Sequence, residues 1–174
     1  MPDFPKSSVK CQSGNSHLRS NKAGFQSRCS DSIKLRFPAE VWPLTKQHID
    51  ASRCFVCGPN NPVGMRIKFR MENGVCKAEY TPSAEQCGYA GITHGGILFS
   101  LLDDVMANWL FLQGERAYTA KCEIRYREPA ATGATIALEG ELTSRKGRYA
   151  SLIGRARNAR DGRLLAESVA TFMV

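Results

Sequence analysis

Apolar and polar residues alternate along residues 65–72, and this period of two is typical of a β-strand with one buried face. The apolar positions are Met65, Ile67, Phe69 and Met71. Asn73-Gly74 follows, and this dipeptide is the strongest short signal for a two-residue hairpin turn. We therefore predict a hairpin whose second strand covers residues 75–80, followed by a loop.

An apolar stretch of different character follows at residues 97–111. Its apolar residues occupy nearly every face of a helix, and such a helix is usually buried on all sides. They are Ile97, Leu98, Phe99, Leu101, Leu102, Val105, Met106, Trp109, Leu110 and Phe111. Gly114 ends the helix. Asp103 and Asp104 interrupt the stretch, which is too short and too charged to span a bilayer.

Strand-like patterns return in four segments after the helix. They are residues 120–126, 135–142, 149–156 and 164–173. Turns at Lys146-Gly147 and Asp161-Gly162 connect the last three, and short turns imply an antiparallel meander. Two strands, one buried helix and four strands indicate the α+β class, with a curved antiparallel sheet around the helix.

The first 40 residues differ from the rest, with eight Ser, seven Lys or Arg and three acidic residues. No periodicity accompanies this composition, which is typical of disorder. We therefore expect a disordered basic Ser-rich tail at 1–44 and one folded domain at 45–174. A solvated appendage, or a start site placed too far upstream, is the favoured interpretation. An organelle transit peptide would also be basic and Ser-rich, whereas a nucleic-acid-binding arm would carry denser basic runs.

The net charge of +8 favours anionic partners. In each of the segments 1–40 and 141–174, seven basic residues accompany three acidic ones, which gives +4, and the chain between them is neutral. The seven cysteines are an odd number and no apolar leader precedes them, so we expect a reduced cytoplasmic protein with mostly free thiols. Neither nucleic acid nor a membrane is an expected partner.

The most informative motif is His94-Gly95-Gly96, which leads directly into the predicted helix. The first N–H groups of a helix have no intrahelical partners, and the helix dipole makes this end electropositive. Glycine there lets a ligand approach the backbone closely, so a carbonyl oxygen that becomes negative during a reaction would be stabilised, as in an oxyanion hole. His94 itself is expected to brace the turn.

Asp103 and Asp104 are costly in an apolar helix unless they are paired or used. Their side chains point about 100° apart, so one can face a site while the other faces solvent or an interface. Two interpretations stay open: at least one of them is functional, or both leave the core at a dimer or solvent edge. If a general base is present, Asp103 is better placed than His94.

Cys54-x-x-Cys57 resembles half of a zinc site, but no second pair with ligand spacing accompanies it. A structural or incidental pair is therefore favoured, and no metal or cofactor is expected. A redox role would call for a βαβ context, which the pattern lacks.

The late basic residues allow two interpretations. Arg145, Lys146 and Arg148 surround one turn, and Arg155 and Arg157 share one sheet face. They form either a solvated outer face or a patch that binds phosphates.

Three blocks between residue 54 and the C-terminus resemble the PaaI-like (phenylacetate-pathway) acyl-CoA thioesterases of the hotdog fold. The blocks are Cys54-x-x-Cys57-Gly58-Pro59-x-Asn61-Pro62-x-Gly64-Met65, Gly88-Tyr89-x-Gly91-Ile92-x-His94-Gly95-Gly96-Ile97 with Leu101-Leu102-Asp103, and Thr119-Ala120 with Tyr126 and Pro129. The resemblance implies a long central helix wrapped by an antiparallel sheet. It also implies a homodimer with sites at the subunit interface, often paired into a tetramer.

The resemblance also implies roles for single residues. The Gly95 N–H would meet the thioester oxygen, Asp103 would activate water or attack directly, and Thr119 would help to orient the water. Asp104 receives no catalytic role. We expect Gly96 to line the substrate site, and Arg145, Lys146 and Arg148 to bind the phosphates of CoA.

Members of the family commonly carry a Gln or Asn six or seven residues before the signature His. The sequence departs from this pattern, because Gly88 and Cys87 occupy these two positions and Gln86 lies one residue further back. Two other functions are weighed. One is a hotdog hydroxyacyl-CoA dehydratase, against which Asp103 in the helix argues. The other is a non-catalytic acyl-CoA-binding or sensing protein.

Overall fold

The computed structural model describes residues 51–174, so the predicted tail at 1–44 lies outside the described residues. The elements are β1 (Arg70–Glu72), β2 (Val75–Tyr80), the 3-10 helix η2 (Ala84–Gln86), β3 (Cys87–Tyr89), β4 (Ile92–Thr93), α1 (Gly95–Phe111), β5 (Tyr118–Tyr126), β6 (Ile136–Lys146), β7 (Tyr149–Asn158) and β8 (Leu164–Met173). No helix among these residues is long and apolar enough to cross a membrane.

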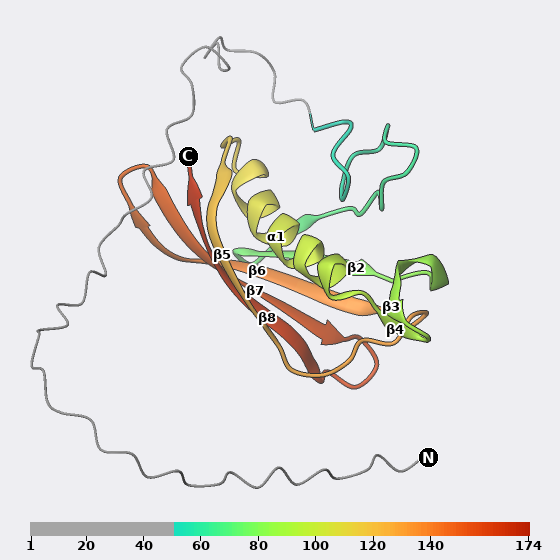
Figure 1. Cartoon of the computed structure of the whole chain (residues 1–174). Coiled ribbons are helices and arrows are strands. Elements are labelled where there is room, and N and C mark those ends of the chain that lie inside the picture. The colour runs from blue at the N-terminus through green and yellow to red at the C-terminus, as the bar shows by residue number, and fades with distance from the viewer. Residues whose placement is uncertain (1–50) are drawn as a thin grey trace, which may run out of the picture. The chain divides into compact units, whose positions relative to one another are not determined.

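Six strands form one antiparallel sheet in the order β1-β2-β6-β7-β8-β5. Figure 1 shows α1 lying across one face of this strongly curved sheet. The helix packs against β2, β5, β6, β7 and β8. The α+β class and the helix wrapped by a sheet are therefore confirmed.

The core lies between α1 and the concave face of the sheet. The helix contributes fully buried side chains at intervals of three and four residues, and β6, β7 and β8 supply the residues opposite. They are Leu101, Leu102, Val105, Met106 and Leu110 on the helix, and Ile136, Leu138, Leu152 and Phe172 on the sheet. Gly140 lets the helix approach the sheet, because a Cβ at this position would lie 2.8 Å from the Val105 carbonyl oxygen.

The predicted strand at 65–72 is wrong over most of its length, since only Arg70–Glu72 form β1. Arg66 has a φ of 54°, which a regular strand does not allow. The Met65 and Ile67 N–H groups instead donate to the carbonyl oxygens of Phe55 and Val56, at 2.8 and 2.9 Å. Ile67 is still buried, so the alternation reports side-chain burial rather than strand pairing.

Two further expectations need correction. Residues 81–93, read as a loop, contain η2 and a small two-stranded sheet of β3 and β4. The meander prediction holds for β6, β7 and β8, but β5 crosses the sheet and pairs with β8. Because β5 ends the sheet order, its other edge is not paired within residues 51–174.

The predicted turns are confirmed. Asn73 and Gly74 both have positive φ, at 51° and 81°, as a two-residue hairpin turn of the favoured kind requires. Gly147 and Gly162 also have positive φ in the turns between β6, β7 and β8.

The helix is not buried on all sides in the single chain. Phe99 is 37% exposed, and Gly96, Ser100 and Asp103 are exposed or half-buried. These positions are three or four residues apart, so they form one uncovered stripe along α1. We call Gly96, Phe99, Ser100 and Asp103 the open face of the helix.

Candidate active site

His94 is the N-cap of α1, and its ring caps the helix. The Gly96 N–H donates to His94 Nδ1 at 2.8 Å. A Cβ at residue 96 would lie 3.0 Å from this nitrogen, so glycine lets the ring sit over the helix end. Because Nδ1 accepts this bond, a neutral ring carries its proton on Nε2. This geometry agrees with the bracing role expected of His94.

Gly95 is the first residue of α1, where the N–H has no intrahelical acceptor. Its carbonyl oxygen accepts a hydrogen bond from the Tyr126 hydroxyl at 2.9 Å, which ties the helix start to the end of β5. A Cβ at residue 95 would lie 3.3 Å from the Tyr126 hydroxyl oxygen. Glycine therefore keeps space for this contact.

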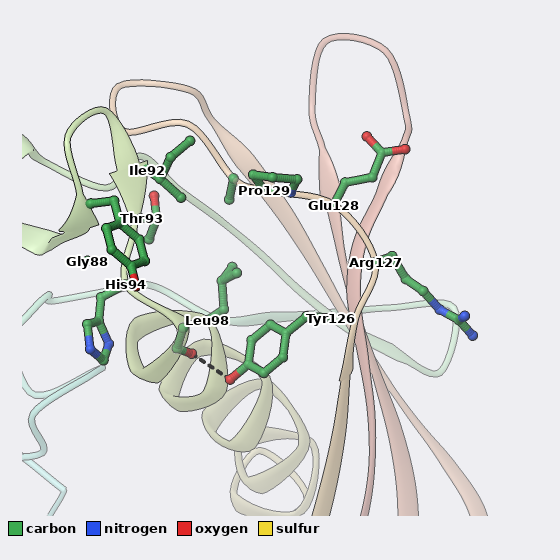
Figure 2. Close-up of a pocket in the computed structure, with 12 residues that line it drawn as sticks. Gly88, Ile92, Thr93, His94, Leu98, Tyr126, Arg127, Glu128 and Pro129 are labelled. Carbon is green, nitrogen blue, oxygen red and sulfur yellow. Dashed lines mark hydrogen bonds between the residues drawn. The ribbon is translucent and has the colours of Figure 1, made fainter. Parts of the chain in front are cut away.

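A pocket of about 500 Å³ opens at this helix end. Its lining includes His94, Gly95, Leu98, Tyr126 and Thr93. Figure 2 shows Tyr126 directed at the first turn of α1. The Thr93 side chain is buried, and among the described residues its hydroxyl oxygen has no hydrogen-bond partner. The pocket thus combines an apolar lining with a free hydroxyl and an electropositive helix end.

Asp103 and Thr119 form a second group. Thr119 Oγ1 on β5 donates to Asp103 Oδ1 on α1 at 2.8 Å. Burial raises the pKa of Asp103, and the Thr119 hydrogen bond opposes that rise. Since the hydroxyl hydrogen is used on the carboxylate, the Thr119 lone pairs can accept a hydrogen bond from a water molecule beside it.

The two groups lie apart in the single chain. Gly95 and Asp103 are eight residues apart on α1, which separates them by about 12 Å along the helix axis. Asp103 and Thr119 are not among the residues that line the pocket at the helix start. The fold therefore brings together His94, Gly95 and Gly96, and separately Asp103 and Thr119.

Residues 90–164 match the model of the thioesterase superfamily. The matched segment runs from β4 through α1 to β7, and it is similar to that superfamily. A search of curated proteins finds no significant match.

Solved structures confirm the hotdog fold expected from the resemblance. A thioesterase superfamily protein has a TM-score of 0.67 and 24% identity, with 78% of this chain and 70% of that chain covered. The Escherichia coli PaaI protein from the phenylacetic acid degradation operon has a TM-score of 0.59 and 22% identity, covering 63% and 84%. A hypothetical thioesterase of Streptococcus pneumoniae, solved with coenzyme A, has a TM-score of 0.58 and 20% identity, covering 62% and 87%.

The S. pneumoniae protein was also solved as two alanine variants. One replaces an aspartate and the other a threonine 16 positions later in its chain. Asp103 and Thr119 of the present hotdog domain are also 16 positions apart.

The basic residues expected to bind phosphates lie away from the helix start. Arg145 forms an ion pair with Glu115, which follows the C-terminal end of α1. The Arg148 guanidinium contacts the sulfur of Met173 at 2.6 Å and stacks on Tyr149. Lys146 ends β6 beside them. Because α1 has 17 residues, this hairpin lies about 25 Å from His94 along the helix.

The outer-face arginines of β7 fit the solvated interpretation better than a phosphate patch. Arg155 pairs with Glu141 at 3.2 Å, and Arg157 donates to the Gly162 carbonyl at the same distance. Arg155 is thus engaged with a residue of β6, and Arg157 with the turn between β7 and β8.

Gln86 does not replace the amide side chain that the family commonly carries. Its Oε1 accepts hydrogen bonds from the Tyr80 hydroxyl at 2.7 Å and from the Ser83 N–H at 3.0 Å. Cys87 and Gly88 are exposed in β3. The Gln86 amide therefore stabilises the turn before β3.

Asp104 points to the other side of α1 from the open face, towards Cys54 and Cys57. Burial raises the pKa of Asp104 to about 6. Burial, together with the negative charge of Asp104, raises the pKa of Cys57 to about 12. These three residues form the one group of His, Cys, Asp and Glu side chains within 51–174 that could hold a metal ion.

Sequence reasoning missed three features of the site. Tyr126 was read only as part of a matching strand, and Thr93 was not singled out. The third is the proximity of Asp104 to the two cysteines. The positions of Tyr126 and Thr93 depend on how β5 and β4 meet the helix start, which no local pattern encodes. The proximity of Asp104 to the cysteines had a partial signal, since the sequence shows both Cys54-x-x-Cys57 and an acidic residue in an apolar helix.

Proposed function

We propose that this protein is an acyl-CoA thioesterase, which hydrolyses the thioester of an acyl- or aryl-acyl-CoA to the free acid and CoA. The observation that carries the proposal is the hydrogen bond from Thr119 to the half-buried Asp103. The same residue types at the same spacing were chosen for replacement in the S. pneumoniae thioesterase. The coenzyme A bound to that protein supports the choice of substrate.

The helix start is suited to polarise the thioester. Attack on the carbonyl carbon places negative charge on the carbonyl oxygen, and the Gly95 N–H at the positive end of α1 can donate to it. The Gly96 N–H is already used by His94, so Gly95 is the available donor. Removing one such donor typically slows a reaction about 10²–10³-fold.

Asp103 supplies the second half of the chemistry. Its carboxylate either takes a proton from water, which then attacks the thioester, or attacks directly to form an anhydride that water cleaves. Thr119 holds one carboxylate oxygen, so the other is available for the water or the substrate. In both routes CoA leaves as the thiol after it has gained a proton.

A second copy of the chain completes the site in this proposal. One thioester cannot contact both Gly95 and Asp103 of the same helix, because about 12 Å separates them. If two copies pack their open faces together about a two-fold axis, Asp103 of one copy can approach Gly95 of the other. The unpaired edge of β5 borders this face and can extend the sheet across the interface.

The same packing gives the basic hairpin a place. A two-fold axis across the open faces runs the two helices antiparallel, so the C-terminal end of each lies near the N-terminal end of its partner. The hairpin of Arg145, Lys146 and Arg148 then approaches the partner's pocket, where it can bind the phosphates of CoA. The resemblance also implies that such dimers often pair into a tetramer, and the proposed site does not depend on this further association.

A cytoplasmic location is part of this proposal. The five cysteines of residues 51–174 are free thiols, as expected in a reducing compartment.

The two rival functions make different demands. A hydroxyacyl-CoA dehydratase needs a histidine that faces the substrate, whereas His94 Nδ1 is occupied by the Gly96 N–H. A non-catalytic acyl-CoA sensor would share the binding site but would not need the Thr119–Asp103 pair. The pair therefore favours hydrolysis over sensing.

A thiol-release assay over acyl-CoAs of different chain length and with aryl-acyl groups tests the proposal. The wild-type protein should release CoA from at least one class, and Asp103→Asn should reduce kcat by about 10²–10⁴-fold with an unchanged circular dichroism spectrum. Asp161→Asn, in an exposed turn, is the matched control and should keep wild-type turnover. Tight acyl-CoA binding without CoA release would favour the sensor and contradict the proposal.

A further inference from the structure

The first block of the sequence, Cys54-x-x-Cys57-Gly58, takes no part in the proposed hydrolysis. The structure brings both of its sulfur atoms to α1. Cys54 Sγ lies 3.7 Å from Asp104 Oδ1, although the two residues are 50 positions apart. The two sulfur atoms and a carboxylate oxygen of Asp104 all lie within 4.8 Å of one another, and all three residues are half-buried.

We propose that Cys54, Cys57 and Asp104 bind one thiophilic divalent cation, with zinc as the natural candidate, and that water completes the coordination. Two thiolates and a carboxylate form a donor set that suits zinc, whereas magnesium and calcium prefer oxygen ligands alone. The ion would link the segment of residues 54–57, which precedes β1, to the middle of α1.

The distances agree with a tetrahedral ion. Zinc binds sulfur at about 2.3 Å and carboxylate oxygen at about 2.0–2.2 Å, so neighbouring ligand atoms are about 3.5 Å apart. The observed 3.7 Å between Cys54 Sγ and Asp104 Oδ1 is close to this separation. Only small side-chain movements are needed to close the group on an ion.

The backbone around the cysteines is folded tightly. The N–H groups of Val56 and Cys57 point at Cys54 Sγ, at 3.4 and 3.5 Å, and donors at a sulfur atom stabilise negative charge on it. Gly58 is required by the turn, since a Cβ there would lie 2.4 Å from the Cys54 nitrogen. The turn therefore presents both sulfur atoms on one side.

Asn108 supplies the surrounding hydrogen bonds that metal ligands usually have. Its side-chain amide donates to Asp104 Oδ2 at 2.9 Å and lies 3.8 Å from Cys57 Sγ. The Asp104 oxygen nearer to Cys54 is thus left for the ion. Partners of this kind orient the ligands of metal sites, and their loss typically weakens metal binding about 10–100-fold.

Charge also favours a cation at this place. Asp104 is half-buried against two thiols, and a carboxylate away from water is costly unless an opposite charge accompanies it. No lysine or arginine forms an ion pair with Asp104 within residues 51–174. A divalent cation would supply the missing charge.

Cobalt titration of the full chain tests the proposal without any measurement of activity. The protein is reduced, stripped with a chelator and titrated with Co²⁺. We expect one ion per chain, with thiolate-to-cobalt charge-transfer absorption and the intense visible bands of tetrahedral cobalt. Zinc should displace the cobalt and raise the Tm of the wild-type protein.

Matched variants locate the site. Cys54→Ser and Cys57→Ser should abolish the charge-transfer absorption, and Asp104→Asn should weaken binding by about tenfold or more. Cys87→Ser, at an exposed cysteine outside the group, should leave the titration unchanged, as should Cys11→Ser combined with Cys29→Ser. Circular dichroism checks that each variant is folded.

Two results would overturn the proposal. One is the absence of cobalt absorption in the reduced wild-type protein, which needs no variant to interpret. The other is a Cys54–Cys57 disulfide, located by mass spectrometry of unreduced peptides, that resists reduction and so leaves no thiols to bind cobalt.

Discussion

The Thr119 hydroxyl on β5 donates to the Asp103 carboxylate on α1 at 2.8 Å. This bond joins the edge strand of the sheet to the open face of the helix, and it fixes one oxygen of the carboxylate that the proposed hydrolysis uses. Asp103 itself is half-buried, on the side of the helix that the single chain leaves partly uncovered.

Thr119→Val should lower kcat by about 10–100-fold, because the carboxylate and its water lose their orientation. Thr119→Ser restores the hydroxyl and should recover most of the activity. Thr143→Val is the control, since the Thr143 hydroxyl also donates at 2.8 Å but at an exposed position of β6. Steady-state kinetics on the preferred acyl-CoA provide the measurement. An unchanged kcat in Thr119→Val would show that the hydrogen bond has no part in turnover.

Gly95→Pro removes the N–H donor without disturbing the helix. Proline is favoured at the first position of a helix, and His94 has a φ of −61° and a ψ of 136°, which a following proline accepts. We expect kcat to fall by about 10²–10³-fold. Gly95→Ala adds a comparable methyl group near Tyr126 but keeps the N–H, so its loss should be much smaller. Equal losses in the two variants would indicate that crowding, and not the missing donor, is responsible.

Much of this fold follows from local patterns, and the rest depends on contacts between distant segments. Strand β8 has the predicted bounds, and the helix, expected to end at Gly114, ends three residues earlier at Phe111. Both were found because apolar residues alternate or repeat along them. Residues 65–69 show the same alternation, yet the N–H groups of Met65 and Ile67 donate to the carbonyl oxygens of residues 55 and 56. A period of two reports which side chains are buried and not which backbone is the partner.

The site was predictable to a similar extent. His94, Gly95 and Asp103 stand in one continuous motif, so the sequence identified them together. Their separation into two groups follows from helix geometry and becomes meaningful only with a second copy. The pairing of β5 with β8, which puts Thr119 beside Asp103, could not be deduced from short turns because β5 crosses the sheet.

The double variant Lys146→Gln, Arg148→Gln should raise KM for acyl-CoA and make it less sensitive to salt, while kcat stays nearly constant. Positive charges that bind phosphates act on the bound and the reacting substrate alike, so their loss appears in KM. Arg145 is left in place because its loss would strand Glu115. Lys68→Gln with Arg160→Gln removes the same charge elsewhere on the surface and serves as the control. If both doubles change KM equally, the hairpin has no specific role.

The proposed active site is shared between two copies of the chain, and mixing of subunits tests this sharing. Asp103→Asn and Gly95→Pro should each have less than about a hundredth of the wild-type kcat, but a mixed dimer pairs the intact Gly95 of one chain with the intact Asp103 of the other. After the two proteins are unfolded and refolded together in equal amounts, half of the dimers are mixed and each has one working site. We predict about a quarter of the wild-type kcat per chain. No recovery of activity, with mixed dimers verified by mass spectrometry, would contradict a site shared between the two chains.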